Sequence, residues 1–266
     1  MGLTLPSSGP AYGGPLKSNV RHHRTPFHSD TAMTSNRQSW TNRSQAELDA
    51  LLAERQDDWW NEFYANRAKP VPFFGPEPDE SLSLWVIDGV ISPGKAVDLG
   101  CGNGRNAIFL AKSGFIVEGV DYSQTAIEWA AQRANEASAE VHLSNASVFD
   151  ASLPPASYDF VYDSGCFHHM PPHLRSSYIA LVAAALKPGG WFGMTCFRPE
   201  GGGGLTDEEV YERGTLSGGL GYTDAELREL WSSRFEILSL RQMQEHPAGS
   251  SVFGKAFLWV MLARKT

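Results

Sequence analysis

The sequence has no uninterrupted apolar run of about 18 residues, the length from which a membrane-spanning helix is inferred. We therefore expect no transmembrane helix. Cysteine is scarce: three cysteines in 266 residues form no disulfide framework, which is typical of a reducing cytoplasm. The net charge of -8 argues against a nucleic-acid partner, because such a partner requires a broad basic face.

Residues 1–43 differ in composition from the rest of the chain. They are rich in Ser, Gly, Pro and Thr, and their only acid is Asp30, so the local charge is positive. No helical or strand period is visible, and we expect a disordered N-terminal extension. The segment lacks the apolar core of a signal peptide, whereas a transit peptide stays open because such segments are also rich in Ser and Arg.

Residues 44–92 are expected to form an N-terminal helical cap. Ser44 and Glu47 have the spacing of a capping box, which predicts that a long helix begins there and ends before Pro70. The stretch 60–74 is unusually aromatic. A short helix over 81–92 then connects the cap to the main domain, 93–266.

The main domain is organised around a glycine motif at residues 96–111. An apolar, extended segment is followed by three glycines at alternate positions, Gly100, Gly102 and Gly104, and then by residues with helical spacing up to the helix stop Gly114. A strand, a glycine turn and a helix in this order are typical of the phosphate- or nucleoside-binding corner of a doubly wound α/β sheet.

The spacing around the glycines limits the class of ligand that this turn could bind. A dinucleotide fingerprint would need a third glycine where this chain has Arg105, and no Lys follows as in a P-loop. The next apolar strand ends in Asp121, at about the distance from the glycines at which an acid binds ribose hydroxyls in such folds. The glycine motif and Asp121 together predict nucleoside binding. Either feature alone would also be consistent with a buried strand that ends in a solvent-exposed residue.

The remaining pattern predicts an α/β sheet of seven strands, at 96–99, 116–121, 141–143, 157–163, 191–197, 235–242 and 256–263. Helices are expected after Ser123, from Pro171 to Leu186, and from the capping box at Thr223 to about Trp231. The last two strands read as an antiparallel pair. Between Phe197 and this last helix we expect a loop of about 25 residues, a length typical of functional or disordered segments.

The motif Asp98-x-Gly100-x-Gly102-x-Gly104 resembles the first motif of the class I S-adenosylmethionine (SAM) dependent methyltransferases. Leu186-Lys-Pro-Gly-Gly190 before an apolar strand corroborates it. The resemblance extends from about Trp59 to the end of the chain and is closest to the small-molecule, thiopurine- and tellurite-methyltransferase group. It implies a doubly wound, seven-stranded Rossmann-like sheet with a C-terminal antiparallel pair. It also implies SAM as cofactor, and a small-molecule acceptor methylated at a thiol, amine or hydroxyl by a monomer or homodimer.

The resemblance also implies which residues form the site. Asp98 would orient the loop or meet the SAM ammonium, and Asp121 would bind the ribose. The implied cofactor residues are Asp98, Gly100, Cys101, Gly102, Asn103, Gly104, Arg105, Asn106, Asp121, Tyr122, Ser123, Ser147, Val148, Asp163, Ser164 and Gly165. The cap would cover the cofactor and shape a substrate pocket, or alternatively pack on the flank of the sheet. Pocket candidates are Trp60, Tyr64, Arg67, Phe74 and Glu200.

The reaction centre is expected at residues 163–169, after the central strand. Methyl transfer needs alignment more than charge stabilisation, and it needs a base only when the acceptor arrives protonated. His168 or, second, His169 has a suitable pKa for a base, and Asp163 is the third candidate, with a role in shaping the cofactor site favoured. The alternative is that the two histidines cap a helix or fix the loop.

Three other interpretations stay open with different weights. Cys101, Cys166 and Cys196 could converge with the histidines on a metal or a soft metalloid, but no Cys-x-x-Cys spacing is present, and we predict no metal site. The chain could also be a catalytically silent SAM-binding module. An NAD-type oxidoreductase is disfavoured by Arg105 and by the lack of a second binding half.

Overall fold

The computed structural model describes residues 39–52 and 59–266. The predictions for the extension 1–43 fall almost entirely outside this part of the chain, as does the middle of the long helix expected after Ser44. Within the described residues, no helix has the length and the apolar character needed to cross a membrane.

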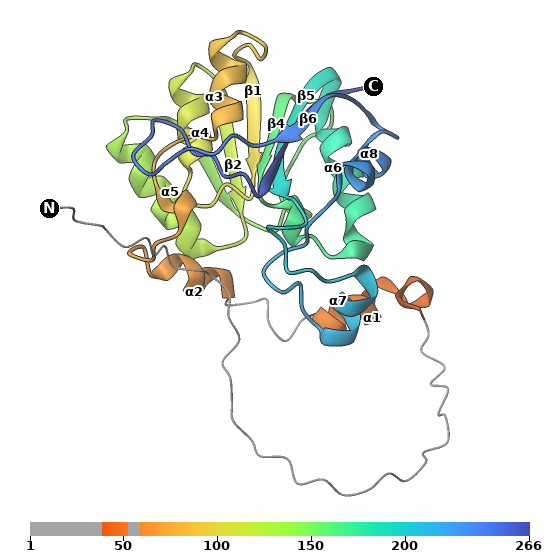
Figure 1. Ribbon diagram of the computed structural model, residues 1–266. Coiled ribbons are helices and arrows are strands. Elements are labelled where there is room, and N and C mark those ends of the chain that lie inside the picture. Colours follow the sequence, from red (N-terminus) through yellow and green to blue (C-terminus); the bar gives the residue numbers. More distant parts are fainter. Residues whose placement is uncertain (1–38, 53–58) are drawn as a thin grey trace, which may run out of the picture. The chain divides into compact units, whose positions relative to one another are not determined.

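A seven-stranded sheet forms the centre of the chain, in the order β3-β2-β1-β4-β5-β7-β6 (Figure 1). The strands are β1 (Lys95–Leu99), β2 (Ile116–Asp121), β3 (Val141–Asn145), β4 (Tyr158–Ser164), β5 (Leu186–Phe197), β6 (Phe235–Gln242) and β7 (Leu258–Lys265). The first five are mutually parallel, and β7 lies antiparallel between β5 and β6. The expected seven strands and the closing antiparallel pair are therefore confirmed.

Helices cover both faces of this sheet (Figure 1). The helices among the described residues are α1 (Gln45–Leu52), α2 (Trp59–Ala65), α3 (Glu80–Ile87), α4 (Arg105–Lys112), α5 (Gln124–Glu136), α6 (Arg175–Ala185), α7 (Asp207–Arg213) and α8 (Asp224–Trp231), of which α1, α2 and α7 lie beyond one end of the strands (Figure 1). Leu82 of α3 and Leu110 of α4 pack in one core cluster, and Val182 of α6 and Trp231 of α8 pack in another. The sheet is thus buried on both sides, as expected for parallel strands.

The strand order places the ligand edge of the sheet. It reverses between β1 and β4, which are neighbours although β2 and β3 come between them in the chain. Open α/β sheets bind ligands beyond the carboxyl ends of the strands at such a reversal. Leu99 of β1 pairs with Asp163 of β4, so the segments after these two strands begin side by side.

The expected loop after Phe197 contains a helix that the sequence analysis missed. Thr206 accepts a hydrogen bond from the backbone N–H of Glu209, whose side chain binds the Thr206 N–H, and this capping box starts α7. The predicted boxes at Ser44 and Thr223 have the same reciprocal contacts. The helix expected from Pro171 instead begins as a 3-10 turn, Pro172–Leu174, and becomes α6 at Arg175.

Candidate functional site

The glycine turn between β1 and α4 is held against the end of β2. The N–H groups of Gly100 and Cys101 both donate to the carbonyl of Val120, at 2.8 and 3.0 Å. Gly102 has φ +54°, and a Cβ atom there would lie 2.7 Å from the hydroxyl of Tyr64. A Cβ atom at Gly100 would lie 2.9 Å from the Cβ of Cys166. Glycine is therefore required for the close approach of neighbouring segments.

Asp98, near the end of β1, has a buried carboxyl group, and neither of its oxygens has a hydrogen-bond partner among the described residues. Burial raises its pKa well above the usual range; the nearby Arg105 opposes this shift, and the carboxylates of Asp79, Asp163 and Asp121 add to it. A buried acceptor without a donor is costly and rare in native proteins. This carboxylate is therefore suited to receive a cationic or hydrogen-bond-donating ligand.

Asp121 ends β2 and ties the turn together. One carboxylate oxygen accepts the N–H of Gly102 and the other accepts the N–H of Ser123, both at 2.8 Å. Burial raises the pKa of this acid. Each carboxylate oxygen has a second lone pair, so each can still accept a hydrogen bond from a ligand hydroxyl group. Ser123 caps α5 by accepting the Ala126 N–H, as predicted.

Asn145 joins the end of β3 to the end of β2. Its amide donates to the carbonyls of Asp121 and Tyr122, at 3.1 and 2.8 Å. This holds the segment of Ser147 and Val148, two of the expected cofactor residues, beside the end of β2, where the N–H of Ala146 also donates to the carbonyl of Asp121. Val148 is buried, and Ser147 accepts the N–H of Phe149 through its hydroxyl.

Asp163, at the end of β4, organises the loop after that strand. Its carboxylate accepts the N–H groups of Cys166 and Phe167 and the hydroxyl of Tyr178, at 2.7, 3.0 and 2.6 Å. Burial raises its pKa to about 7, although these hydrogen bonds oppose the shift. The contacts fit the predicted shaping role better than proton abstraction, because the oxygens already serve the loop.

The two histidines of this loop differ in what their rings can do. Nδ1 of His168 accepts the backbone N–H of Phe197 at 3.2 Å, and the two rings stack with centroids 3.7 Å apart. Burial lowers the pKa of His168, so its Nε2 carries the hydrogen and cannot accept a proton. His169 meets Trp60 edge to face at 4.7 Å, and burial lowers its pKa to about 4. His169 is the histidine left with a basic nitrogen at neutral pH.

The aromatic cap lies against the glycine turn and α5. Tyr64 and Phe74 are buried, stack on each other, and both meet Trp129 of α5. Trp60 stacks on Tyr64 and contacts the reaction-centre loop at His169. These contacts bring three of the predicted pocket residues to the ligand edge of the sheet.

The other two predicted pocket residues make contacts of a different kind. Arg67 is exposed; it donates to Gln132 at 2.8 Å and lies over the ring of Trp129. Glu200 is largely exposed and lies 3.5 Å from Arg198. No contact of either residue with the glycine turn is found among the described residues.

Arg105, expected at the cofactor, contacts a buried acid that the sequence analysis did not single out. Its guanidinium is 2.7 Å from Asp79 and 3.0 Å from the hydroxyl of Ser164, and it donates to the carbonyl of Glu77. The side-chain amide of Asn106 also binds Asp79: its oxygen accepts the Asp79 backbone N–H, and its nitrogen donates to the Asp79 carboxylate. Asp79 left no signal in the sequence because its partners are 26 to 85 residues away.

The three cysteines are free thiols. Burial raises the pKa of Cys101, Cys166 and Cys196, which keeps them protonated and weakly reactive. Among residues 39–52 and 59–266, no group of three or more His, Cys, Asp or Glu side chains could hold a metal ion.

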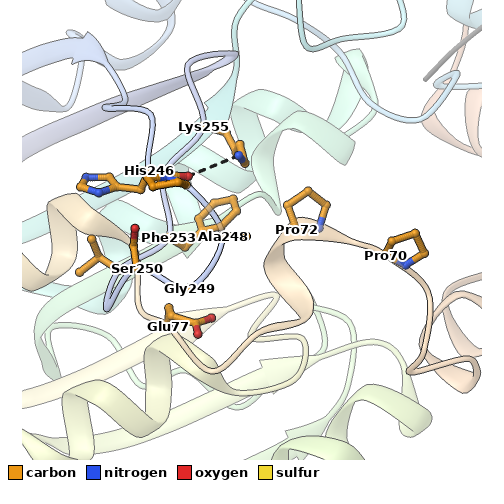
Figure 2. A pocket seen from close by; sticks show the side chains of 12 residues that line it. Pro70, Pro72, Glu77, His246, Ala248, Gly249, Ser250, Phe253 and Lys255 are labelled. Carbon is orange, nitrogen blue, oxygen red and sulfur yellow. Dashed lines mark hydrogen bonds between the residues drawn. The ribbon is translucent and has the colours of Figure 1, made fainter. Parts of the chain in front are cut away.

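A pocket of about 280 Å³ lies outside the predicted site (Figure 2). It is lined by Pro70, Pro72 and Glu77 and by the loop between β6 and β7 from His246 to Lys255. Phe253 in this lining stacks under the guanidinium of Arg105 at 4.5 Å. The pocket therefore adjoins Arg105 through Phe253.

Residues 96–190 match the family model of a methyltransferase domain. The ubiquinone biosynthesis O-methyltransferase of Coxiella burnetii is 31% identical over 143 residues, which cover 53% of this chain and 57% of that protein. The match thus spans a little over half of the relative's length.

Solved structures agree on the architecture. The 1,6-didemethyltoxoflavin-N1-methyltransferase of Burkholderia thailandensis, with bound 1,6-didemethyltoxoflavin and S-adenosylhomocysteine (SAH), has a TM-score of 0.60 at 23% identity, covering 84% of this chain and 91% of that one. TehB from Haemophilus influenzae has a TM-score of 0.53 at 23% identity, covering 68% and 61%. The chain shares the seven-stranded Rossmann-like architecture of these structures, and the predicted fold class is confirmed.

Proposed function

We propose that this protein is a SAM-dependent methyltransferase that acts on a small molecule. The observation that carries the proposal is the pair of acids at the glycine turn: Asp98 with an unpartnered buried carboxylate, and Asp121 with lone pairs left beside Gly102. A ligand with an ammonium at one end and sugar hydroxyls next to it would satisfy both. The matched methyltransferase model covers the same residues.

SAM would supply an electrophilic methyl group on a sulfonium. Asp98 would bind the ammonium, Asp121 the ribose hydroxyls, and Tyr122 with Ser147 and Val148 would flank the adenine. Gly100 and Gly102 would let Cys166 and Tyr64 lie against the turn and enclose the amino-acid end of the ligand. The loop 163–169, shaped by Asp163, would present the acceptor to the methyl group, and the cap would exclude water.

For an acceptor that arrives protonated, His169 is the base of the proposed reaction. Its ring is neutral at pH 7 and faces Trp60. His168 would position the loop through Phe197. The aromatic cap favours a flat, apolar acceptor that bears a hydroxyl, an amine or a thiol. A thiol is included among these acceptor groups because of the resemblance to the thiopurine methyltransferase group.

Calorimetry with SAH and SAM tests the cofactor, and release of SAH from SAM with a panel of phenols, amines and aromatic thiols tests the activity. We expect micromolar binding and turnover with at least one acceptor class. Binding without turnover would favour the silent module, and absence of binding by folded protein would refute both. The structure offers no observation that favours a nicotinamide cofactor.

A further inference from the structure

Two adjacent acids, Asp79 and Glu80, enter the core where α3 begins, and each pairs with an arginine. Asp79 is fully buried and lies 2.7 Å from Arg105 of the glycine motif. Glu80 is 2% exposed and pairs with both terminal nitrogens of Arg241, at 2.6 and 2.9 Å. The first acid thus faces the candidate site, whereas the second faces β6.

Asp79 joins the end of β4 to the beginning of α4. One carboxylate oxygen accepts the hydroxyls of Tyr162 and Ser164, both at 2.6 Å, and the amide of Asn106 at 3.1 Å. The other oxygen accepts from Arg105. A single buried carboxylate therefore fixes the distance between the helix of the glycine motif and the strand that leads to the reaction-centre loop.

The same motif holds the chain that connects the cap to α3. The amide of Asn103 donates to the carbonyls of Phe73 and Phe74, both at 3.2 Å, and Arg105 donates to the carbonyl of Glu77 at 2.9 Å. The chain between the cap and α3 is thus held by Asn103 and by Arg105, and the guanidinium of Arg105 is itself held by Asp79.

Asp79 also keeps Arg105 away from Asp98. Arg105 lies close enough to Asp98 to favour its ionised form, yet no hydrogen bond joins the two, and the oxygens of Asp98 have no partner. An arginine released from its own acid would turn to the nearest unpaired carboxylate, because an unpaired buried charge is costly. Asp98 would then be occupied before a ligand arrives.

We propose that Asp79 is a positioning residue of the methyltransferase site: it holds Arg105 and Ser164 so that the glycine turn, the cap and the end of β4 keep the geometry that binds SAM, with Asp98 left unpaired. The inference rests on the proposed function. Asp79 touches neither the cofactor nor the acceptor in this proposal and acts through the side chains it holds.

The test compares Asp79→Asn with the matched control Glu80→Gln. Both variants neutralise a buried acid paired with an arginine, so both should melt at a lower temperature than the wild type. Only Asp79→Asn should weaken SAH binding in calorimetry and raise KM for SAM, by roughly tenfold to a hundredfold. Equal SAH affinities for the two folded variants would overturn the inference.

Two further measurements distinguish a failure of the proposed function from a failure of the inference about Asp79. A wild-type protein that does not bind SAH overturns the proposed function itself, whatever the variants do. If Asp79→Asn does not fold, Ser164→Ala takes its place, with Ser81→Ala as control because the Ser81 hydroxyl is buried without a partner. We expect about fivefold weaker SAH binding for Ser164→Ala only, and equal binding by the two serine variants would overturn the inference.

Discussion

The hydroxyl oxygen of Tyr64 lies 2.7 Å from the point that a Cβ atom on Gly102 would occupy. The cap helix α2 and the glycine turn therefore share one space, and the missing side chain of Gly102 is what allows the cap to close. This contact makes the size of residue 102 the first quantity to test.

Replacing Gly102 by Ala should weaken SAH binding at least tenfold, because the new methyl group collides with Tyr64 and the backbone has φ +54°. Gly89→Ala is the matched control: its φ is +70°, but no atom of the described part of the chain lies within 4 Å of the added atom. Both variants carry the backbone strain, so calorimetry isolates the collision. Similar affinities for the two variants would show that the cap does not close over the turn.

The Asp98→Asn variant should lose ligand affinity while the free protein keeps its stability. Because the raised pKa keeps Asp98 protonated in the ligand-free protein at neutral pH, the amide replaces one neutral buried group by another, and the free energy of unfolding should change by less than about 1 kcal/mol. SAH affinity should fall at least tenfold because the ammonium loses its charged acceptor. Chemical denaturation and calorimetry measure the two quantities. An unchanged SAH affinity would exclude Asp98 as the ammonium site.

The pKa of Asp98 also predicts the pH dependence of binding. Burial raises this pKa in the free protein, whereas pairing with an ammonium requires the ionised form. Binding of SAH should therefore release a proton, and the affinity should rise with pH. Calorimetry in buffers of different ionisation enthalpy detects the released proton, and Asp98→Asn should not release it.

His169→Gln should lower kcat about 10²- to 10⁴-fold if the acceptor needs deprotonation, while SAH affinity changes little. The rate of the wild type should fall on acidification as His169, with its pKa of about 4, becomes protonated. His168→Gln, by contrast, removes the ring that accepts the Phe197 N–H and should cost stability. Equal kcat for wild type and His169→Gln would mean that no histidine base is used.

Asp163 should make the protein less stable as the pH rises. Its folded pKa of about 7 lies above the unfolded value, so the folded state binds the extra proton between about pH 4 and 7. Its contribution is present below that window and is lost as the pH rises through 7, by up to about 1.4 kcal/mol per pH unit. The pKa values of His168 and His169 are lowered by folding, so below about pH 6.5 these residues make the folded protein more stable as the pH rises.

The comparison that isolates this effect is Asp163→Asn against the wild type in urea titrations from pH 4.5 to 8. The histidine contributions are common to both proteins. The difference in unfolding free energy should therefore change with pH in the direction set by Asp163. A difference that does not vary with pH would contradict the raised pKa.

Much of the architecture was predictable because it is written in local patterns. The apolar strands, the alternate glycines and the capping boxes at Ser44 and Thr223 each depend on residues within a few positions of one another. Helix α7 was missed although Thr206 and Glu209 have the same spacing, because the glycines on both sides suggested an uninterrupted loop. The fold of the central sheet followed from these local signals and from the resemblance.

The polar contacts at the site were less predictable because their partners are distant in the sequence. The family resemblance implied that Arg105 lies at the cofactor, and no residue near it in the sequence indicated that Asp79 holds its guanidinium. The roles of His168 and His169 also depend on a distant group, the backbone N–H of Phe197. Sequence patterns named the segments that meet at the ligand edge but not the hydrogen bonds that distinguish their members.

Two backbone hydrogen bonds join the segment at the start of α3 to the loop between β6 and β7. The N–H of Phe253 donates to the carbonyl of Pro78, and the N–H of Glu80 donates to the carbonyl of Phe253, both at 2.8 Å. Replacing the β6–β7 loop by that of another protein would thus remove the backbone partners of residues 78–80, which connect the cap to α3. An exchange of this loop should therefore include residues 78–80 as well.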